Sequence, residues 1–166
     1  LQKLPQRMEC YDISNFQGKE AVGSMVCFLE GEPAKKSYRK FKIKTVHQPN
    51  DYEMMREVLK RRFLKIEEKG WVRPDLIVVD GGRGQLGVAQ KVLEGLEMTG
   101  VDLISLAKKK EGEKQDKVFI PGRKNPILLK PRSSVLHLLM QIRDEAHRFA
   151  VTYHRKLRSK KVIPPL

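Results

Sequence analysis

The sequence predicts one α/β domain with a mixed sheet, flanking helices and a long C-terminal helix. Residues 7–43 carry three strand-like segments separated by turn residues. Residues 76–79 form a continuous apolar run that precedes a helical pattern, and strand and helix patterns alternate from there on. The chain has 166 residues, enough for one hydrophobic core and too few for two full domains.

The N-terminal part predicts an antiparallel meander. Residues 7–13 alternate apolar and polar side chains with the period of a strand, and turn-forming residues follow at 14–18. Residues 21–29 are β-branched and apolar, and residues 37–43 alternate again with lysines on one side. We therefore expect three antiparallel strands, the last of them at an edge.

A helix is predicted to follow the meander. Asn50 can cap its first turn, with Glu53 three residues later, and apolar residues then recur at helical spacing as far as Ile66. Gly70 is expected to end this helix.

The middle of the chain predicts a β-α-β unit. The apolar run at residues 76–79 is typical of a strand covered on both faces, and it stops at Asp80-Gly81-Gly82. A helix is expected at about residues 85–96 and a parallel strand at residues 103–106. These two strands complete a predicted sheet of five.

Two short strands, at residues 118–120 and 127–129, and a last helix complete the expected fold. Ser133 or Ser134 can cap this helix, whose apolar stripe reaches Tyr153. The chain lacks an initial Met and ends in Val-Ile-Pro-Pro-Leu, so we expect a piece of a longer cytoplasmic protein. The domain is placed at residues 1–158 and the start of a linker at residues 159–166.

Composition favours a nucleic-acid partner over a membrane or a disulfide framework. Lys and Arg total 34 against 20 Asp and Glu, a net charge of +14, and residues 108–132 alone hold nine basic and three acidic residues. A surface that only promotes solubility is the alternative, but +14 exceeds that need. No apolar run approaches the roughly 20 residues of a membrane span. Cys10 and Cys27 lack metal-ligand spacing and are expected to be buried thiols.

Two acids lie at strand positions where α/β proteins commonly place their functional sites. Asp12 keeps the parity of Met8 and Cys10, so a carboxylate continues an otherwise apolar strand face, and Asp80 ends the buried strand before two glycines. If the two strands are neighbours, the carboxylates converge. Mg²⁺ or Mn²⁺ is the usual partner of such a pair in phosphoryl chemistry. Each acid alone could equally be a turn cap or a surface residue.

Asp51 and His147 are further candidates with ordinary alternatives. Asp51 lies in a first helical turn, where the helix dipole favours any acid. His147 lies at the border of the last apolar stripe beside Arg143 and Arg148, which could keep it neutral as a general base or nitrogen ligand. A structural histidine is the plain alternative.

Three motif matches carry less weight. Residues 82–87 fit GxGxxG, but the acid that should end the next strand is missing, because Asp102 precedes it. Residues 144–147 spell DEAH within a helix, and no phosphate-binding GxxxxGK[ST] accompanies them. Lys108, Lys109 and Lys110 could be a solvated or localisation-like cluster, or could meet backbone phosphates.

Three collinear segments resemble the RNase H-like endonuclease domain of the bacterial excision repair protein UvrC. They are ECYDISNFQG at 9–18, PDLIVVDGGRGQL at 74–86 and QIRDEAHRFA at 141–150. The resemblance spans nearly the whole chain. The family's N-terminal GIY-YIG nuclease, UvrB-binding segment and helix-hairpin-helix pair are absent from this sequence. Asn50 and Asn15-Phe16 depart from the commoner family residues but leave the candidate catalytic positions unchanged.

The resemblance implies a sheet of strand order 3-2-1-4-5, with the first three strands antiparallel and the strand of Asp12 beside that of Asp80. It also implies catalysis by Asp12, Asp80 and His147, a further family acid at Asp51, and Mg²⁺ or Mn²⁺ held by Asp12 and Asp80. The expected reaction is the incision 5′ to a DNA lesion, within the SOS response. The expected contacts to the DNA backbone come from basic residues: Arg39, Lys42, Arg83, Lys108, Lys109, Lys110, Arg143, Arg148 and Arg155.

The expected partners are double-stranded DNA and UvrB, with UvrA acting upstream, and we expect this chain itself to be monomeric. A catalytically silent module that binds DNA or docks a partner remains the alternative. Such a module would tolerate Asp12→Asn, whereas an endonuclease would not.

Overall fold

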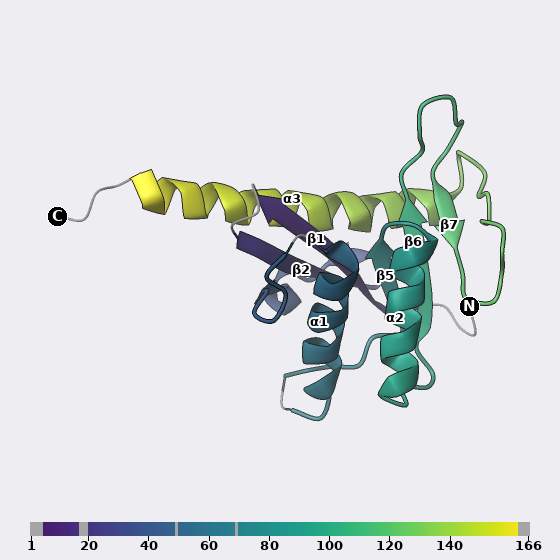
Figure 1. The fold of residues 1–166 in the computed structure, drawn as a ribbon. Helices are drawn as coiled ribbons and strands as arrows, with labels where there is room; N and C mark the ends of the chain where they lie inside the picture. Colours follow the sequence, from purple (N-terminus) through teal and green to yellow (C-terminus); the bar gives the residue numbers. More distant parts are fainter. Residues whose placement is uncertain (1–4, 17–19, 49, 69, 163–166) are drawn as a thin grey trace.

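The computed structural model describes residues 5–16, 20–48, 50–68 and 70–162 and has three layers. Helices α1 (Asp51–Leu64) and α2 (Arg83–Gly95) cover one face of a sheet, and the long helix α3 (Ser134–Val162) crosses the other (Figure 1). No helix within these ranges is long and apolar enough to cross a lipid bilayer.

The N-terminal half of the sheet is antiparallel, as predicted. Strand β1 (Arg7–Phe16) pairs with β2 (Glu20–Leu29), and β2 pairs in turn with β4 (Arg39–Lys42) and with the two-residue β3 (Glu32–Pro33). A short 3₁₀ turn, η1 (Lys35–Ser37), leads into β4.

The C-terminal half is parallel except at its edge. Strand β5 (Leu76–Asp80) pairs in parallel with both β1 and β6 (Asp102–Ala107), and β7 (Lys117–Phe119) is antiparallel to β6. The full order is β3-β2-β1-β5-β6-β7, with β4 also on β2. The predicted order 3-2-1-4-5 is therefore confirmed as β4-β2-β1-β5-β6. The two-residue β3 pairs with β2 on the same side as β4, and β7 adds a strand beyond β6.

Three element boundaries differ from prediction. Strand β1 continues through the expected turn to Phe16, because residues 14–16 keep pairing with β2. Helix α1 ends at Leu64, and hydrogen-bonded turns carry the chain on to Gly70, where φ is +89°. Residues 127–129 form no strand. Ile127 makes a single bridge to Val118, with one backbone hydrogen bond in each direction.

Strand parity divides the core into two clusters. Met8 and Cys10 of β1 pack toward α3 against Ile142 and Ala146, whereas Tyr11 packs toward α1 and α2. Both cysteines are buried free thiols, as predicted. The next residue in the series of Met8 and Cys10 is Asp12, so this parity turns its carboxylate toward α3.

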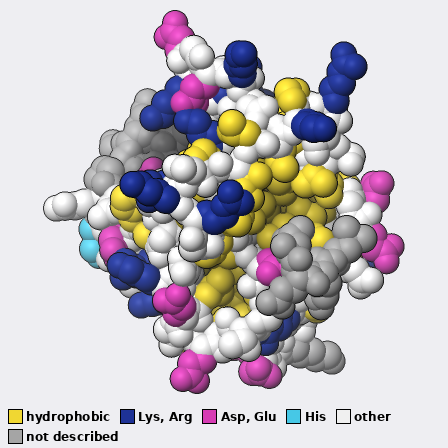
Figure 2. Space-filling view, turned by 90° about the vertical axis from the view of Figure 1, so that its right-hand side faces the viewer, with side chains coloured by type: hydrophobic (Ala, Val, Ile, Leu, Met, Phe, Trp, Pro, Cys, Tyr) yellow, Lys and Arg dark blue, Asp and Glu magenta, His cyan; other side chains and the backbone are white. Residues whose placement is uncertain are grey.

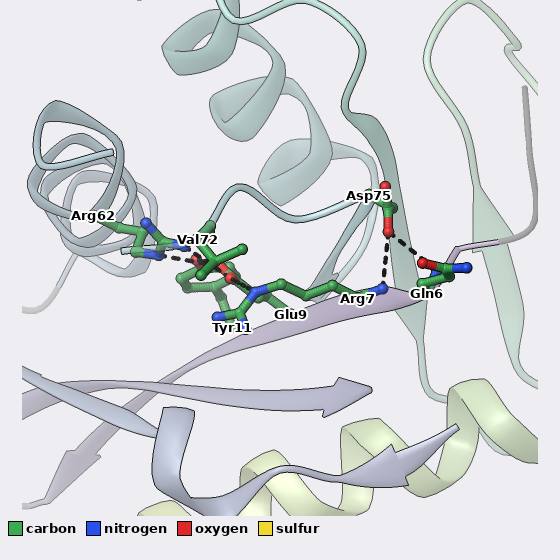
Figure 3. Close-up of polar contacts among 7 residues, drawn as sticks. All are labelled: Gln6, Arg7, Glu9, Tyr11, Arg62, Val72 and Asp75. Carbon is green, nitrogen blue, oxygen red and sulfur yellow. Dashed lines mark hydrogen bonds and ion pairs between the residues drawn. The ribbon is translucent and has the colours of Figure 1, made fainter. Parts of the chain in front are cut away.

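A buried ionic cluster ties β1 to α1 (Figure 3). The Arg62 guanidinium donates to both carboxylate oxygens of Glu9, at 3.2 and 2.8 Å, and also to the carbonyl of Val72. Glu9 accepts a further hydrogen bond from the Tyr11 hydroxyl at 2.6 Å and one from Arg7 at 3.0 Å. Glu9 and Arg62 are both fully buried, so each ion depends on the other for neutralisation.

Gly23 of β2 allows α1 to approach the sheet closely, and we expect Gly23→Ala to destabilise the fold. A Cβ there would lie 2.3 Å from a methyl group of Val58, which is buried in α1. The expected loss is about 1–3 kcal/mol of unfolding free energy. Gly87→Ala in α2 is the matched control, because nothing lies within 4 Å of a Cβ there and alanine should stabilise that helix by about 0.5–1 kcal/mol. Urea denaturation measures both, and equal effects of the two substitutions would contradict the close packing.

Candidate active site

Asp12 and Asp80 lie side by side on two central strands of the sheet, where β5 ends. Strands β1 and β5 run parallel with Tyr11 opposite Val79, so Asp12 and Asp80 are the next residues on the two strands. Each acid continues a series of alternate side chains that faces α3, with Cys10 two residues before Asp12 and Val78 two residues before Asp80. Asp80 ends β5, whereas β1 continues past Asp12 to Phe16. The structure therefore brings the two predicted acids together on one face.

Asp75 helps to set the register that brings these acids together (Figure 3). One of its carboxylate oxygens accepts the backbone N–H groups of Gln6 and Arg7, at 3.1 and 2.9 Å, and its own N–H donates to the carbonyl of Arg7. These bonds join the start of β1 to the residue just before β5. A slip by one residue would turn one of the two acids to the other face of the sheet.

The two carboxyl groups are poorly neutralised. Burial raises the pKa of Asp12 to about 7, and the negative charge of Asp80, a hydrogen bond to Asp80 and the charge of Asp51 act in the same direction. Burial also raises the pKa of Asp80, although the charge of Arg143 works against this shift. Two neighbouring acids whose pKa values are raised in this way favour the binding of a cation, which stabilises their ionised forms.

His147 reaches the pair from α3. Its Nδ1 lies 3.7 Å from Oδ2 of Asp12, and its side chain is 72% exposed. The preceding residue, Ala146, is fully buried against the sheet, so α3 lies close enough for the imidazole to overhang Asp12. The imidazole thus presents one nitrogen near Asp12 while the rest of the ring is open to solvent and substrate.

Arg143, one helical turn before His147, is buried and not on the surface. Its Nη1 donates to Oδ2 of Asp116 at 2.8 Å, and Nη2 contacts Asp144 at 3.3 Å. The other oxygen of Asp116 accepts the N–H of Lys109 at 2.8 Å. Asp116 thereby anchors the loop of Lys108, Lys109 and Lys110 to α3. Asp116 does not stand out in the sequence, because its partner lies 27 residues away.

Asp51 is exposed in the first turn of α1, where Asn50 caps the helix by accepting the N–H of Glu53 at 3.2 Å. Asp51 makes no direct contact with Asp12 that the structure records, but its charge contributes to the raised pKa of Asp12. It thus lies within electrostatic range of Asp12.

The remaining basic candidates differ in the contacts that the structure records for their side chains. Arg39 donates to two backbone carbonyls and lies 5.5 Å from the Trp71 ring, and Arg148 holds Glu145 through two hydrogen bonds of 2.7 Å. Arg148 is nonetheless exposed, as are Lys42, Arg83, Lys108, Lys109, Lys110 and Arg155.

A divalent cation fits the Asp12–Asp80 pair on chemical grounds. Among the described residues no group of three or more His, Cys, Asp or Glu is placed to hold a metal. Mg²⁺ and Mn²⁺ sites in nucleases are commonly built from one or two carboxylates, with water and substrate phosphate as the other ligands. Burial of the two acids raises their pKa values, and a bound cation would favour their ionised forms.

An apolar cavity of about 570 Å³ opens far from these acids, at the amino ends of β5 and β6. Figure 2 shows this side of the molecule, where hydrophobic side chains gather. The cavity is lined by residues of α2, of β6 and of the start of α3, including Leu93, Leu103, Val135 and Leu139. It contains no candidate catalytic residue.

Comparison with known proteins gives a consistent result. Residues 1–151 match the model of the UvrC RNase H endonuclease domain. A UvrABC system protein C from Citrifermentans bemidjiense is 56% identical over 165 residues, and one from Dictyoglomus thermophilum is 53% identical over 164 residues. These alignments cover 94% and 98% of this chain but 26% of each relative, so the chain spans about a quarter of their length.

Solved structures share the fold at low sequence identity. One is Ciona intestinalis endonuclease V in complex with a 23mer DNA containing an inosine followed by a ribo-adenosine. It has a TM-score of 0.55 and 14% identity, with 92% of this chain and 87% of that chain covered. Human ENDOV has a TM-score of 0.54 and 12% identity, with 90% and 86% covered. At these identities the similarity supports an RNase H-like fold and nothing finer.

Proposed function

The chain belongs to the UvrC RNase H endonuclease domain family, and from this premise we propose that it hydrolyses a DNA phosphodiester 5′ to a lesion in nucleotide excision repair. One observation carries the proposal, namely the pairing of buried Asp12 with half-buried Asp80 beneath the exposed imidazole of His147. Two neighbouring acids whose pKa values are raised by burial lower the stability of the folded chain. A catalytic site is a common reason for retaining such a pair.

The proposed chemistry divides the work among three kinds of residue. Endonucleases of the RNase H-like fold generally depend on divalent metal, and Mg²⁺ or Mn²⁺ held by Asp12 and Asp80 would stabilise the charge that develops on the phosphate. His147 accepts a proton from the attacking water or orients that water. The basic residues dock the phosphates that flank the reacting one.

Lesion recognition and partner contacts are proposed to lie outside these residues. Trp71 is the only tryptophan in the sequence, and its ring is covered by Arg62 at 4.9 Å and by Arg39 at 5.5 Å. It packs against the core and is a poor lesion probe. We therefore propose that UvrB, loaded on DNA by UvrA, brings damaged duplex to this domain in the cytoplasm.

A chimera tests the proposed function. Residues 1–166 replace the matching quarter of the Citrifermentans bemidjiense relative, and incision is measured on a duplex with one lesion in the presence of that organism's UvrA and UvrB. We expect incision 5′ to the lesion, and its loss in the Asp80→Asn chimera. A gel shift with the UvrB–DNA complex is the control for assembly. Parental incision by the Asp80→Asn chimera would favour the silent docking module instead.

The lysine loop is expected to supply phosphate contacts without sequence preference. Replacing Lys108, Lys109 and Lys110 together by Ala should flatten the slope of log affinity for duplex DNA against log salt by about 2–3, if each ammonium group meets one phosphate. The matched control replaces three exposed lysines remote from this loop in sequence, Lys60, Lys91 and Lys124. Fluorescence anisotropy over a range of NaCl concentrations measures both slopes. Equal slopes for the two triple variants would show that the three lysines of the loop are solvated and make no phosphate contacts.

A further inference from the structure

The row of side chains that contains the two acids continues onto β2. Ser24 lies directly opposite Asp12 in the antiparallel register of β1 and β2. The preceding pairs on this face, Cys10 with Val26 and Met8 with Phe28, all belong to the cluster that packs beneath α3. Ser24 therefore stands beside Asp12 on the α3 face, and Asp80 stands on the other side of Asp12.

The Ser24 hydroxyl is buried without a partner. Ser24 is 0% exposed, and its Oγ has no hydrogen-bond partner among the described residues. Leaving a buried hydroxyl unpaired is unfavourable, and such groups are rare enough in folded proteins to require an explanation. Alanine or valine would fill a purely structural position here at lower cost.

Asp12 is the acceptor that stands nearest in register. Opposite residues of an antiparallel pair have Cβ atoms about 4.5–5.5 Å apart, so a short hydroxyl side chain on one strand can reach a carboxylate on the other. A carboxylate that held a divalent cation would be ionised and would offer only acceptor atoms, so it could accept the hydroxyl proton of Ser24.

We propose that Ser24 is a positioning residue that donates a hydrogen bond to the Asp12 carboxylate when Asp12 holds a divalent cation. This role rests on the proposed function. Ser24 then fixes Asp12 from the buried side, while His147 lies 3.7 Å from it on the exposed side. Hydrogen bonds to ligating carboxylates of this kind orient the carboxylate and raise metal affinity.

The chain provides a matched control in Ser105 of β6. Ser105 is likewise 0% exposed with an unpartnered Oγ. Its register partners are Val79 and Phe119, which pack on the α1–α2 side, so it faces away from the acids. The two serines thus share residue type, burial and lack of a partner, and differ in the face they occupy.

The experiment measures Mn²⁺ affinity of the 166-residue chain at pH 8 from the electron paramagnetic resonance signal of free Mn²⁺. Ser24→Ala should raise the dissociation constant about tenfold, as is common for residues that support a metal ligand, and Ser105→Ala should leave it unchanged within about twofold. Melting in EDTA should show Ser24→Ala no less stable than the parent, because the removed hydroxyl has no partner there. Ser24→Cys, a weaker donor of similar shape, should give an intermediate affinity.

The outcomes separate this role from the proposed function. Parental Mn²⁺ affinity in Asp12→Asn would contradict the metal site and the proposed function together. If Asp12→Asn binds weakly while Ser24→Ala binds like the parent, only the role of Ser24 fails. Equal weakening by Ser24→Ala and Ser105→Ala, or parental affinity in Ser24→Cys, would also overturn it.

Discussion

Asp12→Asn is expected to abolish DNA cutting and, at the same time, to stabilise the metal-free chain at pH 8. The loss of activity should be at least about a thousandfold, because a carboxylate that holds the metal contributes on the order of 4 kcal/mol to the transition state. The gain in stability follows from removing an acid that is buried beside Asp80 without a neutralising cation. A cutting assay with Mg²⁺ and chemical denaturation in EDTA measure the two effects.

The pH dependence of the stability change has a defined sign. Burial and Asp80 raise the pKa of Asp12 from its ordinary value near 4 to about 7, so the folded chain binds this proton more tightly than the unfolded chain. The stabilisation by the proton is complete below about pH 4 and is lost as the pH rises through about 7. The advantage of Asn should therefore be small at pH 4.5 and reach at most about 4 kcal/mol at pH 8.

Glu67→Gln, which changes an exposed acid, is the control for a general charge effect and should alter neither cutting nor stability. An Asp12→Asn variant that melts below the parent at pH 8 would show that the Asp12 carboxylate stabilises the fold. One that cuts at the parental rate would favour the docking module.

Arg62→Met is expected to cost about 3–5 kcal/mol of unfolding free energy, because it leaves the Glu9 carboxylate buried without its main cation. The Tyr11 hydroxyl and Arg7 still contact Glu9, but Arg7 alone then supplies positive charge at 3.0 Å. The double variant Glu9→Gln with Arg62→Met removes both ions and should recover most of the loss. Urea denaturation of the parent, the single variants and the double variant closes the cycle.

The neighbouring residue provides the control for this prediction. Arg61 is partly exposed and pairs with Glu57 at 3.2 Å, so Arg61→Met should cost no more than about 1 kcal/mol. A double variant as unstable as Arg62→Met would show that the arginine acts through packing against Trp71 and Phe63, which it contacts at 4.9 and 5.3 Å.

Local patterns in the sequence determined the sheet and the positions of its two acids. The parity of Met8, Cys10 and Asp12 fixes which face the carboxylate occupies, since side chains alternate along a strand whatever lies above them. The apolar run before Asp80 likewise identifies a buried strand that ends in an acid. Both inferences depend on residues a few positions apart, and the family resemblance adds the strand order that makes these strands neighbours.

Only the tertiary structure decided how the other groups are arranged around the acids. Arg143 was expected to contact DNA, but Asp116 holds it inside the fold, and Glu9 meets Arg62 across 53 residues. Ser24 resembles any polar residue of a strand until the register places it opposite Asp12. Such contacts depend on how a helix packs on the sheet and on which strand pairs with which. Whether a polar residue at a given position is buried with a partner, buried alone or exposed is therefore not encoded in its local sequence.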